Sequence, residues 1–203
     1  MNDRQTFKSP KLSVEAYIEQ EIDSGIKYEY HNGEIFALAG GTINHGILCS
    51  NIFSQLAIQL TTKRSSCRPY TSEIKLHIVA ENSFVYPDAM VVCDELEVSP
   101  FEKNAIVNPI LIVEVLSKST ANYDRGDKFF KYKQIPSLQE YVLIEQDKAI
   151  VDTYFKRPGV DLWRISRFEG LNSLVQLQSI GIQMLMSDLY AGVKDLADEK
   201  SAD

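Results

Sequence analysis

Cysteine is scarce in this sequence and follows no pattern. Cys49, Cys67 and Cys93 are the only three among 203 residues, and no two of them have the Cys-x-x-Cys spacing. An odd, scattered set argues against a disulfide framework. We therefore expect three reduced, mostly buried thiols in a cytoplasmic protein.

Long apolar runs are missing as well. No stretch approaches the ~20 apolar residues that span a bilayer, and the first 25 residues lack the apolar centre of a signal peptide. There is no internal repeat and no linker rich in proline, glycine or serine. We expect one domain over residues 1–203, with no membrane partner. Its expected parts are a core over about 13–146, additional strands over 147–190 and a polar tail over 191–203.

Positive charge is in short supply. The chain has 21 lysines and arginines against 28 aspartates and glutamates, a net charge of −7. Affinity for a nucleic-acid backbone comes from lysine and arginine, so the balance argues against a protein that coats nucleic acid electrostatically. It leaves room for an enzyme with a local basic patch and a metal-loaded acidic site.

The hydrophobic pattern that is present changes period along the chain. Ser13 is expected to cap a short helix, Asn32-Gly33 to turn a hairpin over 28–38, and Thr42 to cap an amphipathic helix over 43–62. A further helix is predicted over 119–135. Strands are predicted over 70–79, 84–93, 110–116, 139–146, 149–157, 162–170 and 174–185. The core order of helix, three strands, helix and strand indicates an α/β fold with a mixed sheet.

Glu114 is the one charged residue in the apolar strand predicted over 110–116, where the other six residues are apolar. An unpaired carboxylate buried in such a strand costs several kcal/mol. Two ordinary explanations exist, a structural ion pair with an arginine or lysine, and an edge strand that leaves the carboxylate in solvent.

Asp88 occupies a matching position in a second apolar stretch, directly after Pro87. A proline donates no ladder hydrogen bond, so it marks an edge, a strand start or a bulge, and bulges are frequent beside active sites. If the two strands are neighbours, the carboxylates of Asp88 and Glu114 converge at ~5 Å. A cation between them would relieve their repulsion. Mg²⁺ takes one or two protein carboxylates and keeps its waters, so the pair predicts a site for Mg²⁺ or Mn²⁺.

These residues resemble the PD-(D/E)XK nuclease superfamily, and more closely its Uma-type family of restriction-endonuclease-like proteins. The resemblance covers roughly residues 13–146. It rests on the segments YEYHNGEIFALAGG, NHGILCSNIFSQL, YPDAMVVC, LIVEVLSKSTANYDRGDKFFKY and IPSLQEYVLIEQ.

The resemblance implies a restriction-endonuclease-like core with an N-terminal hairpin and extra C-terminal strands. It implies a Mg²⁺-dependent endonuclease acting on DNA, with Asp88 and Glu114 as metal ligands and catalytic residues. The carbonyl of Val115 would be a further metal ligand. Cutting both strands of a duplex would favour a twofold homodimer.

One position departs from the superfamily pattern, which has a lysine two residues after the glutamate. Leu116 stands there in this chain. Lys128, on the next predicted helix, matches a family position and is our candidate for the catalytic lysine; the alternative is a solvated helix lysine. Lys118 lies ~13 Å along an extended strand from Glu114, which suits a substrate phosphate better than the metal.

Five other polar residues are weaker candidates, of which Glu29 and His45 match positions of the family. Glu29 is either an outer metal ligand or a surface glutamate, and His45 either helps to hold phosphate at a helix N-terminus or serves in capping or packing. Ser117, Arg125 and Tyr132 are expected to line the cleft.

Three functions therefore stand open. The first is the Mg²⁺-dependent endonuclease. The second is a nuclease-fold module that serves binding or assembly, its chemistry lost with Leu116. The third is a metal-free enzyme that uses the two carboxylates as acid and base, for instance on a glycosidic bond. Metal titration separates the first from the third, and nuclease assays separate the first from the second.

Overall fold

The computed structural model describes residues 11–38, 40–117 and 120–197. In this part of the chain the central element is a six-stranded sheet of order β11-β10-β9-β8-β6-β3. Its strands are β3 Arg68–Thr71, β6 Ala89–Val92, β8 Leu111–Leu116, β9 Glu140–Glu145, β10 Ile150–Lys156 and β11 Trp163–Glu169. Strands β8 and β9 are parallel and the other neighbours antiparallel, so the sheet is mixed, as expected for the α/β class.

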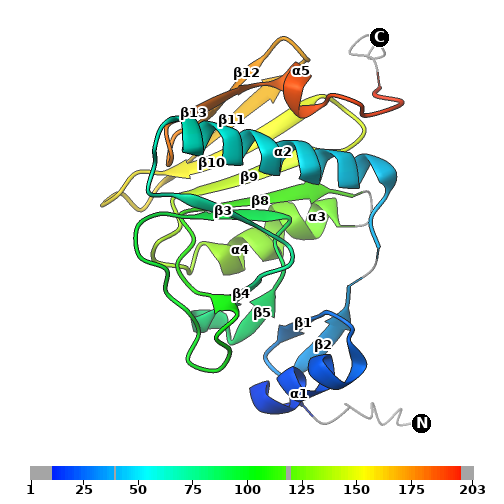
Figure 1. Ribbon diagram of the computed structural model, residues 1–203, viewed down its shortest axis with the longest axis vertical. Helices are drawn as coiled ribbons and strands as arrows, with labels where there is room; N and C mark the ends of the chain where they lie inside the picture. Colours follow the sequence, from blue (N-terminus) through cyan, green and yellow to red (C-terminus); the bar gives the residue numbers. More distant parts are fainter. Residues whose placement is uncertain (1–10, 39, 118–119, 198–203) are drawn as a thin grey trace, which may run out of the picture.

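Helices cover both faces of this sheet (Figure 1). On one face lies α2 (Ile43–Thr62), with Leu48, Ile52, Leu56 and Leu60 as its buried stripe. The other face is covered by the helical segment after β8. That segment comprises α3 Ala121–Tyr123, the π-helix Asp124–Lys128 and α4 Phe129–Tyr132.

Side chains of β8 point alternately to the two faces of the sheet, and this decides which helix lies over Glu114. Val113 and Val115 belong to the core under α2, whereas Ile112 and Leu116 pack in the core that contains Tyr132. Successive strand side chains point to opposite faces, so Glu114 points toward the α3–α4 segment.

Local signals in the first third of the chain act as expected. Helix α1 (Val14–Ser24) begins after Ser13, whose Oγ accepts the Ala16 N–H at 3.2 Å. Asn32 and Gly33 both have positive φ, 47° and 100°, which is the turn that suits a two-residue hairpin between β1 (Tyr28–His31) and β2 (Glu34–Ala37). Thr42 Oγ1 accepts the His45 N–H at 3.1 Å and starts α2 where the sequence predicts it.

Two predicted strands are each divided between two sheets. The stretch 70–79 forms the end of β3 and then β4 (Lys75–Ile78), separated by a turn. The stretch 84–93 forms β5 (Ser83–Val85) and β6, with Pro87 between them. Strands β4 and β5 belong to a five-stranded sheet of order β2-β1-β5-β4-β7, where β7 is Ala105–Ile106. Asp88 therefore lies where the chain passes from one sheet to the other.

The C-terminal part adds strands beyond the central core. The stretch 174–185, predicted as one strand, is a hairpin of β12 (Leu174–Leu177) and β13 (Ile182–Leu185) followed by α5 (Met186–Leu189). The start of the expected polar tail is packed, because Val193 and Leu196 contact the core under α2. Residues 198–203 lie outside the described part.

The cysteines correct an expectation. Cys67 and Cys93 form a disulfide, and Cys49 is the cysteine without one. Strands β3 and β6 pair antiparallel with Arg68 opposite Val92, which brings the flanking cysteines face to face. The prediction of three reduced thiols was therefore wrong. The cysteines no longer support the expectation of a cytoplasmic protein. Separately, no helix of the described residues has the length and apolar content to cross a membrane.

Candidate active site

Asp88 and Glu114 come from adjacent strands, as the sequence predicts. Strand β6 pairs with β8 so that Ala89 faces Val113. Asp88 directly precedes β6, and its Oδ2 accepts the N–H of Val115 at 2.7 Å. The carboxylate thus takes the place of the next ladder acceptor and is held beside the residue that follows Glu114.

The Glu114 carboxylate is buried, with 5% of the residue exposed, and is paired. Tyr132 donates its hydroxyl to Oε1 at 2.6 Å, and the Lys128 ammonium lies 2.8 Å from the same oxygen. These two contacts compensate for the loss of water around the carboxylate. Of the two ordinary explanations, the ion pair applies and the solvent-exposed edge does not.

Lys128 reaches this site because of the π-helix Asp124–Lys128. The wider turn points both of its end residues inward, and π-bulges are frequent at functional sites. Besides Glu114, the Lys128 ammonium lies 3.6 Å from Asp124 Oδ1 and 3.8 Å from Glu29 Oε1. Lys128 is 7% exposed, so it is not the solvated helix lysine of the alternative interpretation.

The site holds more negative than positive charge. Burial raises the pKa of Glu114 to about 8, Lys128 opposes that rise, and the charges of Asp88 and Asp124 add to it. Burial also raises the pKa of Asp124 above its usual value, again against the pull of Lys128. A single buried ammonium therefore does not neutralise the carboxylates around it, which favours binding of a further cation.

The raised pKa of Glu114 predicts a pH-dependent stability of the metal-free protein. Between its ordinary value of 4.5 and about 8, the folded state holds a proton on Glu114 that the unfolded chain has released. The free energy of unfolding should therefore fall as the pH rises through this window. Urea denaturation in a chelating buffer at several pH values measures the slope. Glu114→Gln should flatten it, and equal slopes in the two proteins would contradict the assignment.

Tyr132 is a second testable part of the arrangement. Tyr132→Phe keeps the ring but removes a hydrogen bond whose acceptor is charged above the Glu114 pKa of about 8, so at pH 9 the free energy of unfolding should fall by about 1.5–3 kcal/mol. Tyr141→Phe is the matched control, because its buried hydroxyl donates at 3.0 Å to the neutral carbonyl of Asp124. That variant should lose only about 0.5–1.5 kcal/mol by the same denaturation measurement. Equal losses in the two variants would show that the Glu114 contact has no special strength.

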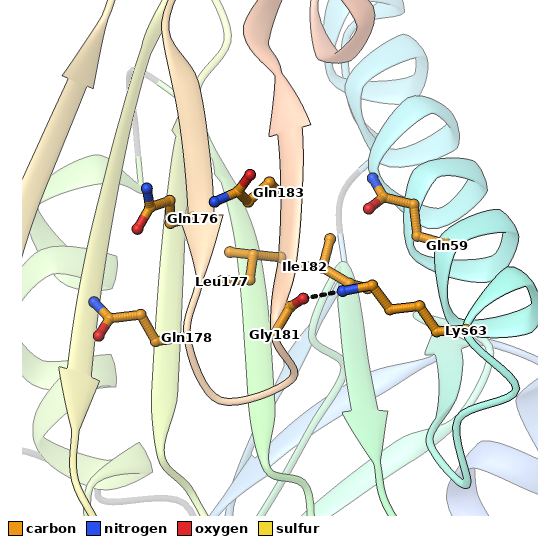
Figure 2. Close-up of a pocket in the computed structure, with 8 residues that line it drawn as sticks. All are labelled: Gln59, Lys63, Gln176, Leu177, Gln178, Gly181, Ile182 and Gln183. Carbon is orange, nitrogen blue, oxygen red and sulfur yellow. Dashed lines mark hydrogen bonds between the residues drawn. The ribbon is translucent and has the colours of Figure 1, made fainter.

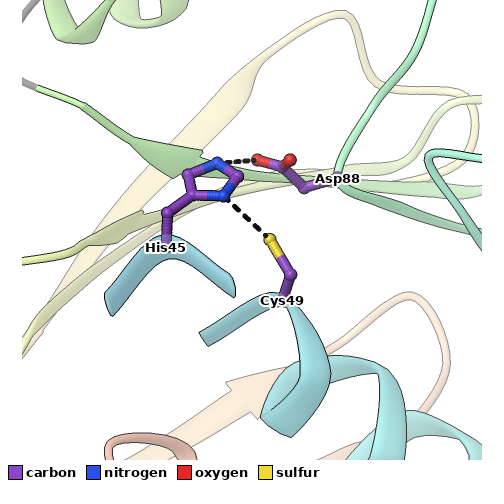
Figure 3. A group of neighbouring side chains, drawn as sticks. All are labelled: His45, Cys49 and Asp88. Carbon is purple, nitrogen blue, oxygen red and sulfur yellow. Dashed lines mark hydrogen bonds and ion pairs between the residues drawn. The ribbon is translucent and has the colours of Figure 1, made fainter. Parts of the chain in front are cut away.

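Asp88 has a different neighbourhood on its other side (Figure 3). His45 Nε2 lies 3.4 Å from Asp88 Oδ2, and His45 Nδ1 lies 3.5 Å from Cys49 Sγ. The hydrogen bond to Asp88 raises the pKa of His45 above its usual value. One ligand atom of each residue falls within 4.8 Å of the others, an arrangement able to hold a metal ion. Cys49 was missed from the sequence, although its position four residues after His45 on a predicted helix was the available signal.

Glu29 joins the site from the N-terminal hairpin. Its side chain is 13% exposed and contacts both Lys128 and, at 3.3 Å, His31 Nε2. Burial opposes ionisation, but the hydrogen bond with His31 and the charge of Lys128 keep the pKa of Glu29 below its usual value. The structure thus does not support a solvated surface glutamate. The role of outer metal ligand stays a prediction.

The remaining candidates are Ser117, Arg125, Val115 and Lys118. The Ser117 hydroxyl bonds Thr120 Oγ1 at 2.9 Å at the end of β8. Arg125 forms ion pairs with Asp152 and Glu145, so it fastens the helical segment to β9 and β10 rather than lining the site. Val115 meets Asp88 through its N–H, and a metal-binding role for its carbonyl stays a prediction. Lys118 lies outside the described residues.

A hollow of about 610 Å³ lies elsewhere, between the C-terminal part of α2 and the β12–β13 hairpin (Figure 2). Its lining residues are Gln59, Lys63, Gln176, Leu177, Gln178, Gly181, Ile182 and Gln183. The Lys63 ammonium donates to the Gly181 carbonyl across it. Neutral amides dominate the lining and the one ammonium is engaged, so the hollow does not compete with Asp88 and Glu114 as a place for chemistry.

Comparison with known proteins places this geometry in a family. Residues 14–187 match the Uma2 family, whose description is "Putative restriction endonuclease". The chain belongs to the Uma2 family. The uncharacterized protein slr1290 of Synechocystis sp. is 34% identical over 187 residues, 91% of this chain and 94% of its own. The uncharacterized protein sll1609 of the same organism is 33% identical over 171 residues, 84% of this chain and 95% of its own.

A solved structure supports the fold of this Uma2 chain. A crystal structure described as that of a putative nuclease belonging to DUF820, from Anabaena variabilis, superposes with a TM-score of 0.63. The match covers 82% of this chain and 90% of the other at 18% identity. The predicted restriction-endonuclease-like α/β fold is confirmed.

Proposed function

We propose that this Uma2 protein is a metal-dependent endonuclease that hydrolyses phosphodiester bonds of DNA. The observation that carries the proposal is the grouping of Asp88 and Glu114 on adjacent strands, with the buried Lys128 ammonium 2.8 Å from Glu114. Family membership supports nuclease chemistry. The choice of DNA, of a homodimer and of the cytoplasm belongs to the proposal.

The donor set fits a hard divalent cation. In the described part of the chain, the contacts to Glu114 fall on Oε1 and those to Asp88 on Oδ2. Each carboxylate therefore keeps one oxygen for a ligand, and Mg²⁺ and Mn²⁺ prefer oxygen ligands. The excess of negative charge described above favours the same class of ion. Asp88 and Glu114 would hold it, with the Val115 carbonyl as a proposed third ligand.

The bound ion supplies Lewis-acid polarisation of the scissile phosphate and a lowered pKa for the attacking water. The chain's own contribution is positional and electrostatic. The Val115 N–H fixes the Asp88 carboxylate, and Tyr132 fixes that of Glu114. Lys128 offsets the negative charge that develops on phosphorus, or orients the attacking water.

Leu116 is compatible with this proposal. It is 1% exposed and packs with Ile112 in the core beneath the helical segment. The positive charge that the superfamily places at this position arrives here from Lys128 on the π-helix. In this proposal Lys128 replaces the missing strand lysine, so Leu116 does not by itself imply a lost activity. This weakens the case for a module that only binds or assembles.

A cleavage assay tests the proposal. Supercoiled plasmid, linear duplex DNA, single-stranded DNA and RNA are each incubated with the protein in EDTA, Mg²⁺ or Mn²⁺. We expect cleavage of DNA in Mg²⁺ or Mn²⁺, none in EDTA and none by Asp88→Ala. Cleavage of RNA alone would correct the substrate. Metal binding without cleavage of any substrate would favour the binding or assembly module, and hydrolysis of glycosidic bonds in EDTA would favour the metal-free enzyme.

A further inference from the structure

Besides the Val115 N–H, Asp88 has neighbours that are softer metal ligands than a carboxylate. His45 and Cys49 are four residues apart on α2, so both project from the same side of the helix. Figure 3 shows the His45 imidazole with one ring nitrogen toward Asp88 and the other toward the Cys49 sulfur, and Asp88 arrives from the segment between β5 and β6. Imidazole, thiol and carboxylate thus converge from two separate elements.

The two separations that involve His45 have the size found between ligands of a tetrahedral ion, although each belongs to a different ring nitrogen. With metal–sulfur and metal–nitrogen bonds of ~2.3 Å and ~2.0–2.1 Å, tetrahedral geometry puts the ligand atoms ~3.6 Å apart, and a nitrogen–oxygen pair ~3.4 Å apart. The observed separations are 3.5 Å for His45 Nδ1 and Cys49 Sγ, and 3.4 Å for His45 Nε2 and Asp88 Oδ2. One ion binds one ring nitrogen. One ligand atom of each residue lies within 4.8 Å of the others, so a modest side-chain rotation would be needed to bring all three to one ion.

The surroundings hold the ligands in place. Thr42 caps α2 through the His45 N–H and also donates at 2.6 Å to Gln146 Oε1, which ties the start of the helix to the end of β9. Gly41 leaves space beside the imidazole, since a Cβ there would lie 2.8 Å from His45 Nδ1. The Val115 N–H fixes Asp88. Such outer contacts orient metal ligands and raise affinity.

We propose that His45, Cys49 and Asp88 form a site for a transition-metal dication of the Zn²⁺ class. Thiolate and imidazole select such ions over Mg²⁺, whereas the oxygen pair of Asp88 and Glu114 selects hard ions. Three protein ligands leave a fourth position for water or a substrate oxygen. Asp88 belongs to both sets, so Zn²⁺ competes with Mg²⁺ for it; this competition rests on the proposed nuclease function, whereas the Zn²⁺-class site does not.

Cobalt is the probe that tests the site directly, because a Co²⁺–thiolate bond gives a charge-transfer absorption in the near ultraviolet. Co²⁺ is titrated into the metal-free protein in the presence of Mg²⁺. We expect the band in the native protein and in Glu114→Gln, and its loss in Cys49→Ser. Co²⁺ affinity should fall at least ~100-fold in Cys49→Ser, because even outer-shell partners contribute 10–100-fold. The double variant Cys67→Ser/Cys93→Ser should keep the band.

Two results would overturn the site: no thiolate band in the native protein, or a band that survives in Cys49→Ser. Circular dichroism checks that variants are folded, and Cys49→Ala gives the same test if Cys49→Ser does not fold. The competition between Zn²⁺ and Mg²⁺ is measured as Mg²⁺-dependent cleavage with and without added Zn²⁺. Zn²⁺ should inhibit the native protein more strongly than Cys49→Ser, and equal inhibition of the two proteins would contradict the competition. If no cleavage is found at all, the Co²⁺ spectra still decide the site.

Discussion

Replacing Glu114 with glutamine is expected to abolish metal-dependent cleavage, a loss of ~10³-fold or more, while the protein stays folded. Glutamine keeps the shape of the side chain and a hydrogen-bond acceptor for Tyr132, but it removes the charge that holds a hard divalent ion. Asp88→Ala should have an equal effect. Single-turnover cleavage at saturating Mg²⁺ measures both losses.

The stability of Glu114→Gln separates a catalytic carboxylate from a purely structural one. Lys128 retains Asp124 at 3.6 Å and Glu29 at 3.8 Å, so the variant leaves no unpaired cation. With one repelling carboxylate fewer, the metal-free variant should be as stable as the native protein or slightly more so. A severe loss of stability would instead favour an ion pair whose role is structural.

Glu140→Gln is the matched control. Glu140 is also a fully buried glutamate and lies on β9, next to β8, but its carboxylate accepts bonds from Ser179 and the Gln178 N–H, away from Asp88. Its replacement should leave cleavage at the native rate. Equal loss of cleavage in Glu140→Gln and Glu114→Gln would mean that any buried charge change damages the enzyme.

Lys128→Met is expected to reduce cleavage by ~10²-fold or more while Mg²⁺ binding persists. The scale is that of losing one preorganised donor near the developing charge. Without metal and above pH 8, where Glu114 is ionised, the variant leaves the carboxylates of Glu114 and Asp124 lacking their buried cation, a change that costs up to about 3–5 kcal/mol. Cleavage is therefore compared at saturating Mg²⁺, where the ion supplies positive charge.

Lys133→Met is the control for that experiment. Lys133 follows α4 and lies over the Phe130 ring at 4.2 Å, apart from the site. The Lys133→Met variant should cleave at the native rate. Full activity in Lys128→Met together with inactivity in Lys118→Met would transfer the catalytic role to Lys118.

The pairing of the two carboxylates was open to prediction because it depends on local pattern. Single charges in apolar stretches marked Asp88 and Glu114, and Pro87 marked a break in the first strand. Their strands are indeed neighbours. The bounds of α2 were equally accessible, since Thr42 and a stripe at helical spacing define them.

What escaped prediction depends on register and on long-range contacts. The alternation of apolar and polar residues in 70–79 and 84–93 looks the same whether the segment stays in one sheet or passes from one sheet to another. Pro87 therefore marked a break between β5 and β6 but did not show that the two strands belong to different sheets. The disulfide Cys67–Cys93 follows from the β3–β6 register, which no local signal contains. The ion pair of Arg125 escaped prediction for a similar reason, because its partner Asp152 is buried on a distant strand.

Calorimetric titration of Mg²⁺ into the metal-free protein tests most directly whether Asp88 and Glu114 form a hard-ion site. Mg²⁺ is the suitable ion because it avoids the thiol and imidazole beside Asp88. We predict saturable binding to the native protein and to Glu140→Gln, and no detectable binding to Asp88→Ala or Glu114→Gln. Absence of binding to the native protein, or unchanged binding to both carboxylate variants, would contradict the account.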